Sequence, residues 1–123
     1  MIKRHHLSIK NAFNGVMWAF KTQPNYKIHL FFSLLALFGS WFLKINRSEF
    51  IVIIMLIFIG FVIETINTGI EATTDAITKQ VREDIKIAKD VSAASMLIYA
   101  IGAVIIAGFI FIPKIISFLL SSP

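Results

Sequence analysis

The sequence predicts an all-helical membrane protein: three transmembrane helices preceded by an amphipathic surface helix. Of its 123 residues, 57% are hydrophobic, which is more than a small soluble domain carries. The apolar residues also gather in three long blocks instead of alternating with polar ones, as membrane spans do. We therefore expect a single membrane-embedded domain over residues 1–123. The expected spans cover about 27–45, 49–70 and 91–113.

The N-terminal segment, residues 3–22, has the pattern of an amphipathic helix. Apolar residues recur at helical spacing and Lys10, Asn11 and Asn14 lie between them, so one face is apolar and the other polar. Such a helix lies in the membrane interface, and the alternative is an ordinary helix packed on the bundle. We expect a mixture of both. Pro24 should end this helix, because proline cannot donate a backbone hydrogen bond.

The boundaries of the later helices can also be read from the sequence. Asn46 or Ser48 is a suitable N-cap for the second span. The apolar run 50–63 is too short to cross a membrane by itself, so its helix must continue into the polar residues that follow. The likeliest break is 78–83. Small residues on the third span, such as Gly102, permit close helix approach, and Pro113 and Lys114 mark its outer end.

Charge placement predicts an orientation. The net charge is +5, and basic residues crowd the N-terminal segment and residues 79–89. Since basic residues favour the cytoplasmic side of a membrane, we expect the N-terminal segment and residues 64–90 in the cytoplasm. The protein would be a multi-pass protein of the inner, cytoplasmic membrane. No nucleic-acid partner is expected, because the basic residues flank spans. The chain has no cysteine, which excludes disulfides and thiolate metal sites.

A polar helix face directly after the second apolar run is the strongest functional signal. Glu64, Asn67, Glu71 and Asp75 fall on one side of a helix. Ionisable groups at the edge of a membrane are costly and usually face a protein interior, a cavity or a metal. Glu71 and Asp75 are one turn apart and could share Mg²⁺, which prefers oxygen ligands. Glu64 is nearest the apolar run, where a poorly hydrated carboxylate is suited to accept a hydroxyl proton.

A second candidate element is Lys89–Asp90, at the cytoplasmic start of the third span. A lysine there is a point charge for phosphate oxygens, whereas Asp90 also suits the helix dipole. Together with the acidic face, the pair is consistent with phosphoryl transfer, in which positioning and electrostatics carry most of the catalysis. No glycine-rich nucleotide loop of the soluble types is present. The alternative is a solvated helix end without catalytic function.

These segments together resemble one known family. Glu64-Thr-Ile-Asn67-Thr-Gly-Ile-Glu71-Ala-Thr-Thr-Asp75, followed by Ala88-Lys89-Asp90-Val-Ser-Ala-Ala, closely resembles the signature of the small prokaryotic integral-membrane diacylglycerol kinases, which include undecaprenol kinases. The N-terminal stretches 8–15 and 20–29 look like the family's surface helix and first span. The resemblance covers nearly the whole chain.

The resemblance implies a homotrimer with active sites at the membrane–cytosol interface, where MgATP phosphorylates a lipid hydroxyl. By resemblance, Glu64 is the catalytic base and Glu71 a metal ligand. The other implied site residues are Lys89 and Asp90 at the nucleotide, Asn67 and Asp75 in support, and Arg4 and Asn11 near ATP.

One position departs from the family pattern. The family usually has a glutamate, a second metal ligand, where this chain has Gln23. A glutamine offers a neutral carbonyl oxygen, which is a weaker Mg²⁺ ligand than a carboxylate. We expect weaker Mg²⁺ binding here, or compensation by Asp75 or water.

The resemblance leaves the acceptor open. Our expectation is transfer of the γ-phosphate of MgATP to diacylglycerol, which gives phosphatidic acid. The alternative acceptor is undecaprenol, giving undecaprenyl phosphate. A different class of function also remains: a non-catalytic membrane subunit in which Gln23 has disabled the metal site.

Overall fold

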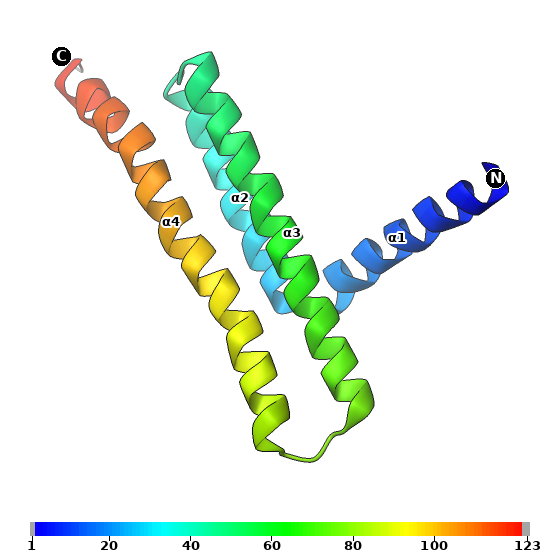
Figure 1. Cartoon of the computed structure of the whole chain (residues 1–123). Coiled ribbons are helices and arrows are strands. Elements are labelled where there is room, and N and C mark those ends of the chain that lie inside the picture. The colour runs from blue at the N-terminus through cyan, green and yellow to red at the C-terminus, as the bar shows by residue number, and fades with distance from the viewer. Residues whose placement is uncertain (1, 122–123) are drawn as a thin grey trace.

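The described residues fold into four helices, and the last three of them pack together as a bundle. The computed structural model describes residues 2–121, with side chains from residue 6 onward. Helices α2, α3 and α4 lie side by side, and α1 leaves the bundle at a steep angle (Figure 1). The helices are α1 (Ile2–Thr22), α2 (Pro24–Phe42), α3 (Arg47–Ile77) and α4 (Glu83–Ser121). The predicted all-helical architecture is confirmed for these residues.

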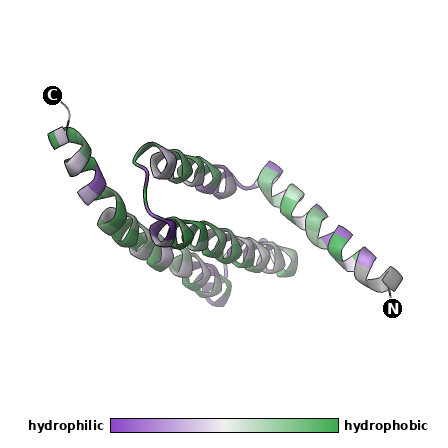
Figure 2. Cartoon of the chain, turned by 90° about the horizontal axis from the view of Figure 1, so that it is seen from above, coloured by the Kyte–Doolittle hydropathy of each residue, from purple (hydrophilic) through white to green (hydrophobic). Residues whose placement is uncertain are grey.

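Two of the helices, α3 and α4, are long and apolar enough to cross a membrane. This finding agrees with the predicted helical membrane protein. Helix α2 has 19 residues and corresponds to the first expected span, which stays a prediction. Most large apolar side chains are exposed, and hydrophobic residues, coloured green, occur along much of all three bundle helices (Figure 2). Exposed apolar side chains are expected in a membrane, because in lipid no hydrophobic effect favours their burial between helices.

The turn between α2 and α3 is closed by local hydrogen bonds. Lys44 takes a positive φ of 49°, and Asn46 is the N-cap of α3. The Asn46 side chain accepts a bond from the Glu49 backbone N–H at 2.9 Å, and the Glu49 side chain accepts one from the Asn46 N–H at 2.8 Å. This reciprocal capping box satisfies two donors that a helix start leaves free. Of the two caps proposed from the sequence, Asn46 is therefore the one used.

Between α1 and α2 the chain bends at Gln23. Helix α1 ends at Thr22, and Pro24 occupies the first turn of α2, where its missing N–H costs nothing. The predicted end of the first helix at Pro24 is confirmed. We call residues Gln23–Tyr26 the elbow, because the chain changes direction there (Figure 1).

Helices α3 and α4 are in close contact at Gly60. A Cβ atom at Gly60 would lie 2.7 Å from the Tyr99 hydroxyl oxygen, so any larger residue would force the Tyr99 side chain or the backbone to shift. The Tyr99 hydroxyl donates to the Leu56 carbonyl, which fixes the same crossing. Gly102 has no neighbour within 4 Å of its Cβ position, so the close approach uses a glycine of the second span rather than of the third.

Both long helices extend beyond their apolar stretches. Helix α3 runs to Ile77 and α4 begins at Glu83, so the predicted break at 78–83 is confirmed. Helix α4 also continues through Pro113 to Ser121. A proline removes one backbone bond, but the residues after it are mostly apolar and good helix formers, so the helix does not stop at Pro113.

Candidate active site

A cavity of about 310 Å³ lies between α2, α3 and α4. Its polar wall comes from Glu64, Asn67 and Glu71 on α3, with Asn25 and His29 on α2. The rest of the wall is apolar or small: Ile28, Ala93, Met96, Leu97 and Ala100. Three of the four residues on the predicted polar face of α3 therefore meet in one cavity.

Glu64 is the most buried carboxylate of the described part of the chain. Only 1% of its surface is exposed, and its Oε2 atom has no hydrogen-bond partner. Asn67 is also buried and its Oδ1 atom lacks a partner. Buried polar atoms without partners are rare, because each one costs free energy. Two such atoms on adjacent turns indicate a site arranged to meet a polar ligand.

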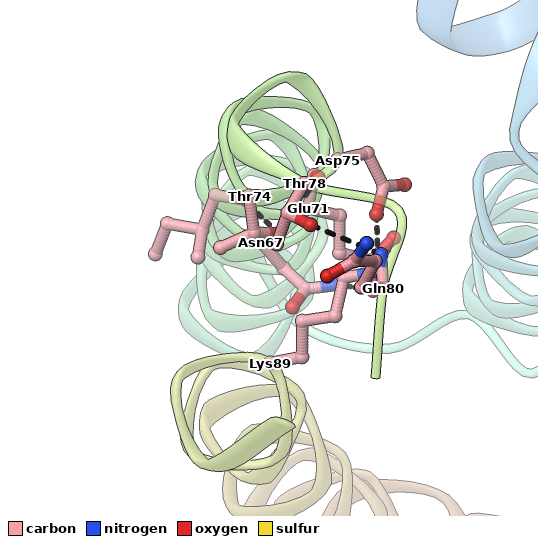
Figure 3. Close-up of polar contacts among 8 residues, drawn as sticks. Asn67, Glu71, Thr74, Asp75, Thr78, Gln80 and Lys89 are labelled. Atoms are coloured by element: carbon pink, nitrogen blue, oxygen red, sulfur yellow. Dashed lines mark hydrogen bonds and ion pairs between the residues drawn. The ribbon is translucent and has the colours of Figure 1, made fainter. Parts of the chain in front are cut away.

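Farther along α3 the polar face becomes more exposed. The Asn67 side-chain N–H donates to Glu71 Oε1 at 3.2 Å, which orients the half-buried Glu71 carboxylate. Asp75, one turn later, is exposed and forms an ion pair with Lys89 of α4, with 2.5 Å between Nζ and Oδ1 (Figure 3). Along the predicted polar face, exposure to solvent therefore increases from the buried Glu64 carboxylate to the exposed ion pair of Asp75.

The ion pair affects the predicted metal site. Because Lys89 neutralises Asp75, a cation shared by Glu71 and Asp75 would have to compete with the lysine; that sharing stays a prediction. Within the described residues no three acidic or histidine side chains converge as a preformed metal centre. Mg²⁺ usually takes one or two carboxylates and completes its shell with water and substrate phosphate. A cavity-facing Glu71 fits that chemistry. Gln23 does not line the cavity, so its predicted role as a metal ligand stays a prediction.

The remaining predicted site residues lie outside the cavity. Asp90 is exposed, with its carboxylate 4.0 Å from Lys86 Nζ. Asn11 is exposed on α1 and does not line the cavity. Arg4 belongs to α1, but its side chain lies outside the described residues. Among the described side chains, those of Asp90 and Asn11 therefore do not line the cavity with Glu64 within one chain.

Two residues of the cavity wall on α2 were not assigned from the sequence. Asn25 lies close enough to Glu64 for its side chain to interact with the carboxylate. His29 lies beside Phe61 and Tyr99, with ring centroids 5.9 and 6.1 Å away. The sequence does mark Asn25, because it is a polar residue directly after Pro24 at the start of an apolar helix. Sequence position alone could not show that Asn25 lies beside Glu64 of α3.

Comparison with known proteins decides the family. A family model for prokaryotic diacylglycerol kinase matches residues 10–111. The chain belongs to this family. The prokaryotic diacylglycerol kinases are lipid kinases, that is, phosphotransferases with an alcohol group as acceptor.

Two curated relatives within this family carry different names. A diacylglycerol kinase of Synechocystis is 31% identical over 112 residues, which cover 90% of this chain and 64% of the relative. The chain thus spans about two thirds of that relative's length. An undecaprenol kinase of Bacillus subtilis is 30% identical over 114 residues, which cover 93% of both chains. The two relatives are similar to this chain to nearly the same degree and differ in the acceptor that they are named for.

Proposed function

We propose that this protein transfers the γ-phosphoryl group of MgATP to the hydroxyl of a membrane lipid alcohol, with diacylglycerol as acceptor and phosphatidic acid as product. The observation that carries the proposal is the buried Glu64 carboxylate with one unpartnered oxygen, in a cavity whose wall is apolar on one side and polar on the other. A lipid hydroxyl and a nucleotide phosphate could both reach such a cavity.

Glu64 is the proposed general base. In this step the acceptor oxygen loses its proton to the Glu64 carboxylate and bonds to the γ-phosphorus, while the bond to the β–γ bridging oxygen of ATP breaks. The products are a lipid phosphate and ADP. Its position among apolar residues such as Ile28 and Leu97 supports the role, because a carboxylate with little water around it takes up a proton readily.

The donor side of the site would lie toward Glu71 and Lys89. Glu71, with Gln23 as a weaker partner, would hold Mg²⁺, which neutralises phosphate charge when it is bound. Lys89 is paired with Asp75 (Figure 3), which is one turn of α3 beyond the cavity-lining Glu71. Its ammonium would attract the phosphates of ATP. Asn67 orients Glu71 through its hydrogen bond, and Asp90 would contact nucleotide from the first turns of α4.

The other parts of the site belong to the proposed assembly. Arg4 and Asn11 are proposed to approach ATP, and both lie on α1, which leaves the bundle. A homotrimer would place α1 of one chain near another chain's cavity. The large outward apolar surface of α2–α4 supports a membrane setting for this trimer, with the site on the cytoplasmic side.

A second acceptor, undecaprenol, is supported by a specific observation. The Bacillus subtilis undecaprenol kinase aligns over 93% of both chains, a larger share of the relative's own length than for the Synechocystis diacylglycerol kinase, at 64%. The deciding experiment uses the purified full-length protein in detergent with labelled ATP and Mg²⁺. Diacylglycerol and undecaprenol are offered separately and then in competition.

The expected result is label in diacylglycerol at the higher kcat/KM, with Glu64→Gln inactive on either lipid. A higher kcat/KM with undecaprenol would reassign the acceptor and leave the chemistry in place. Label in neither lipid, in protein that remains folded, would favour a non-catalytic membrane subunit.

A further inference from the structure

The elbow between α1 and α2 is held against α3 by one buried tyrosine. Tyr26 is 1% exposed, and its ring packs between Phe20 of α1 and Phe61 of α3, at centroid distances of 4.9 and 5.8 Å. The aromatic cluster therefore joins three helices at the point where the chain changes direction. Aromatic packing of this kind holds the elbow against α3, but these ring contacts include no hydrogen bond that would set the elbow's register along α3.

A hydrogen bond supplies that register. The Tyr26 hydroxyl bonds to Thr65 Oγ1 across 39 positions of sequence. Thr65 has one hydroxyl proton, and its Oγ1 lies 2.6 Å from the Phe61 carbonyl oxygen, which can only accept. We therefore assign the Thr65 proton to Phe61 and make Tyr26 the donor to Thr65. The tyrosine hydroxyl has this one partner on α3.

The two bonded residues are direct neighbours of two cavity residues. Tyr26 follows Asn25, and Thr65 follows Glu64. Asn25 and Glu64 both line the cavity, and their side chains are close enough to interact. The Tyr26–Thr65 bond therefore joins the two backbone segments that carry this pair, on the side away from the cavity.

We propose that Tyr26 and Thr65 are positioning residues that hold the elbow in register with α3, so that Asn25 stays beside Glu64. This inference rests on the function proposed above. Neither side chain lines the cavity, so both act through Asn25. Displacing a catalytic neighbour by about 1 Å can lower turnover by about 100-fold, so loss of the hydroxyl bond alone, with the ring packing retained, should lower kcat by about tenfold.

The test is a set of variants that remove or keep the hydroxyl bond. Tyr26→Phe keeps the ring and leaves the Thr65 proton on the Phe61 carbonyl, so it creates no unpaired donor. Thr65→Val removes the acceptor, and Thr65→Ser keeps it. Tyr99→Phe is the matched control, since it removes another part-buried tyrosine hydroxyl bond between helices, to the Leu56 carbonyl, and Tyr99 does not line the cavity.

The expected result is a fall of about tenfold in kcat for Tyr26→Phe and Thr65→Val, with Thr65→Ser near wild type. In an Asn25→Ala background, Tyr26→Phe should not lower kcat further, because the side chain that Tyr26 positions is already absent. A merely structural tyrosine would lower activity equally in both backgrounds, as we expect of any effect of Tyr99→Phe, and that outcome would overturn the proposal. So would an unchanged kcat in Tyr26→Phe.

Hydrogen exchange measured on the same detergent-solubilised proteins separates this inference from the kinase assignment. Amide exchange in residues 20–29 should be faster by several-fold in Tyr26→Phe, and unchanged in Tyr99→Phe. If the wild-type protein phosphorylates no lipid, this readout alone decides whether the hydroxyl fixes the elbow. Equal exchange in Tyr26→Phe and wild type would then refute the inference.

Discussion

The two ends of the α3–α4 pair each hold a lysine–carboxylate bridge, yet their polar groups are satisfied to different degrees. At the capped end, defined by Asn46, Glu49 and Lys114, Lys114 Nζ lies 3.3 Å from Glu49 Oε2, and Glu49 also closes the capping box. At the site end, which carries the polar face from Glu64 to Asp75, Lys89 holds only the exposed Asp75.

The difference shows what each end is built for. Four buried side-chain atoms lack hydrogen-bond partners within the described residues, and all belong to the site end: those of Glu64, Asn67, Thr68 and Ser92. At the capped end, Asn46, Glu49 and Lys114 bond one another, and no buried side-chain atom of the three lacks a partner. An end with completed bonds contributes to folding, whereas an end with unpaired buried groups has given up stability and is suited to bind something polar.

The largest expected effect is at the buried carboxylate of the site end. Glu64→Gln should lower kcat by at least about 1,000-fold, because general bases contribute about 100- to 10,000-fold and glutamine cannot accept the proton. Lipid phosphorylation in detergent measures this, and Glu49→Gln at the capped end should retain turnover. Substantial activity of folded Glu64→Gln would refute the assignment of the base.

Glu71→Gln should have the next largest effect, a fall of about 100-fold in turnover at ordinary Mg²⁺. The amide keeps the bond with Asn67 possible but removes the charge that a cation needs. A titration of activity against Mg²⁺ should show partial recovery at high concentration. Asp75→Asn is the companion variant, and a larger Mg²⁺ effect there than in Glu71→Gln would move the metal to Asp75.

Replacing Lys89 by methionine should act mainly on nucleotide binding. We expect KM for ATP to rise by about tenfold, in the range of one lost charge-assisted contact, with KM for the lipid unchanged. Steady-state kinetics with each substrate varied separately measure the split. Lys86→Met, one turn away and also facing solvent, is the control, and an equal effect there would mean that only the net charge matters.

A smaller gain is expected at the elbow. Gln23→Glu places a carboxylate where this chain has a neutral amide, so the Mg²⁺ concentration for half-maximal activity should fall by a few-fold. Gln23→Ala serves as the control for loss of the carbonyl oxygen. An unchanged Mg²⁺ dependence in Gln23→Glu would show that position 23 does not contact the metal.

At the capped end we expect a change in stability alone. Lys114→Met removes a bridge whose side chains are 33% and 24% exposed, worth about 0.5–1 kcal/mol, so the unfolding temperature should drop by a few degrees while kcat is maintained. Thermal unfolding in detergent measures this. A loss of turnover without a loss of stability would show that the capped end also affects catalysis. The two ends would then no longer differ in function.

The sequence predicted the parts of this molecule that depend on near neighbours. The cap at Asn46, the stop at Pro24 and the break after Ile77 each follow from a few adjacent residues, as did the shared face of Glu64, Asn67 and Glu71. The wall from α2 and the ion pair between Asp75 and Lys89 depend on how separate helices pack, so spacing within one helix could not reveal them.

The same limit applies to close packing. Gly102 and Gly60 look alike in sequence, and only the partner helix decides that Gly60 is the one against Tyr99. Arg4 and Asn11 were assigned to the site from family resemblance, and both belong to α1. The Asn11 side chain does not line the cavity within one chain, so its predicted role at ATP stays a prediction.

Helix α3 has no break between its capping box and the cavity, which has a geometric consequence. Glu49 and Glu64 are separated by about 22 Å along the axis at 1.5 Å per residue, most of a hydrocarbon layer of about 30 Å. The depth of Glu64 in the membrane, and the side of α3 on which it lies, therefore depend on where the N-terminal end of α3 at Glu49 is held. One residue inserted between them would turn Glu64 by about 100°, away from the cavity, without changing any residue of the site.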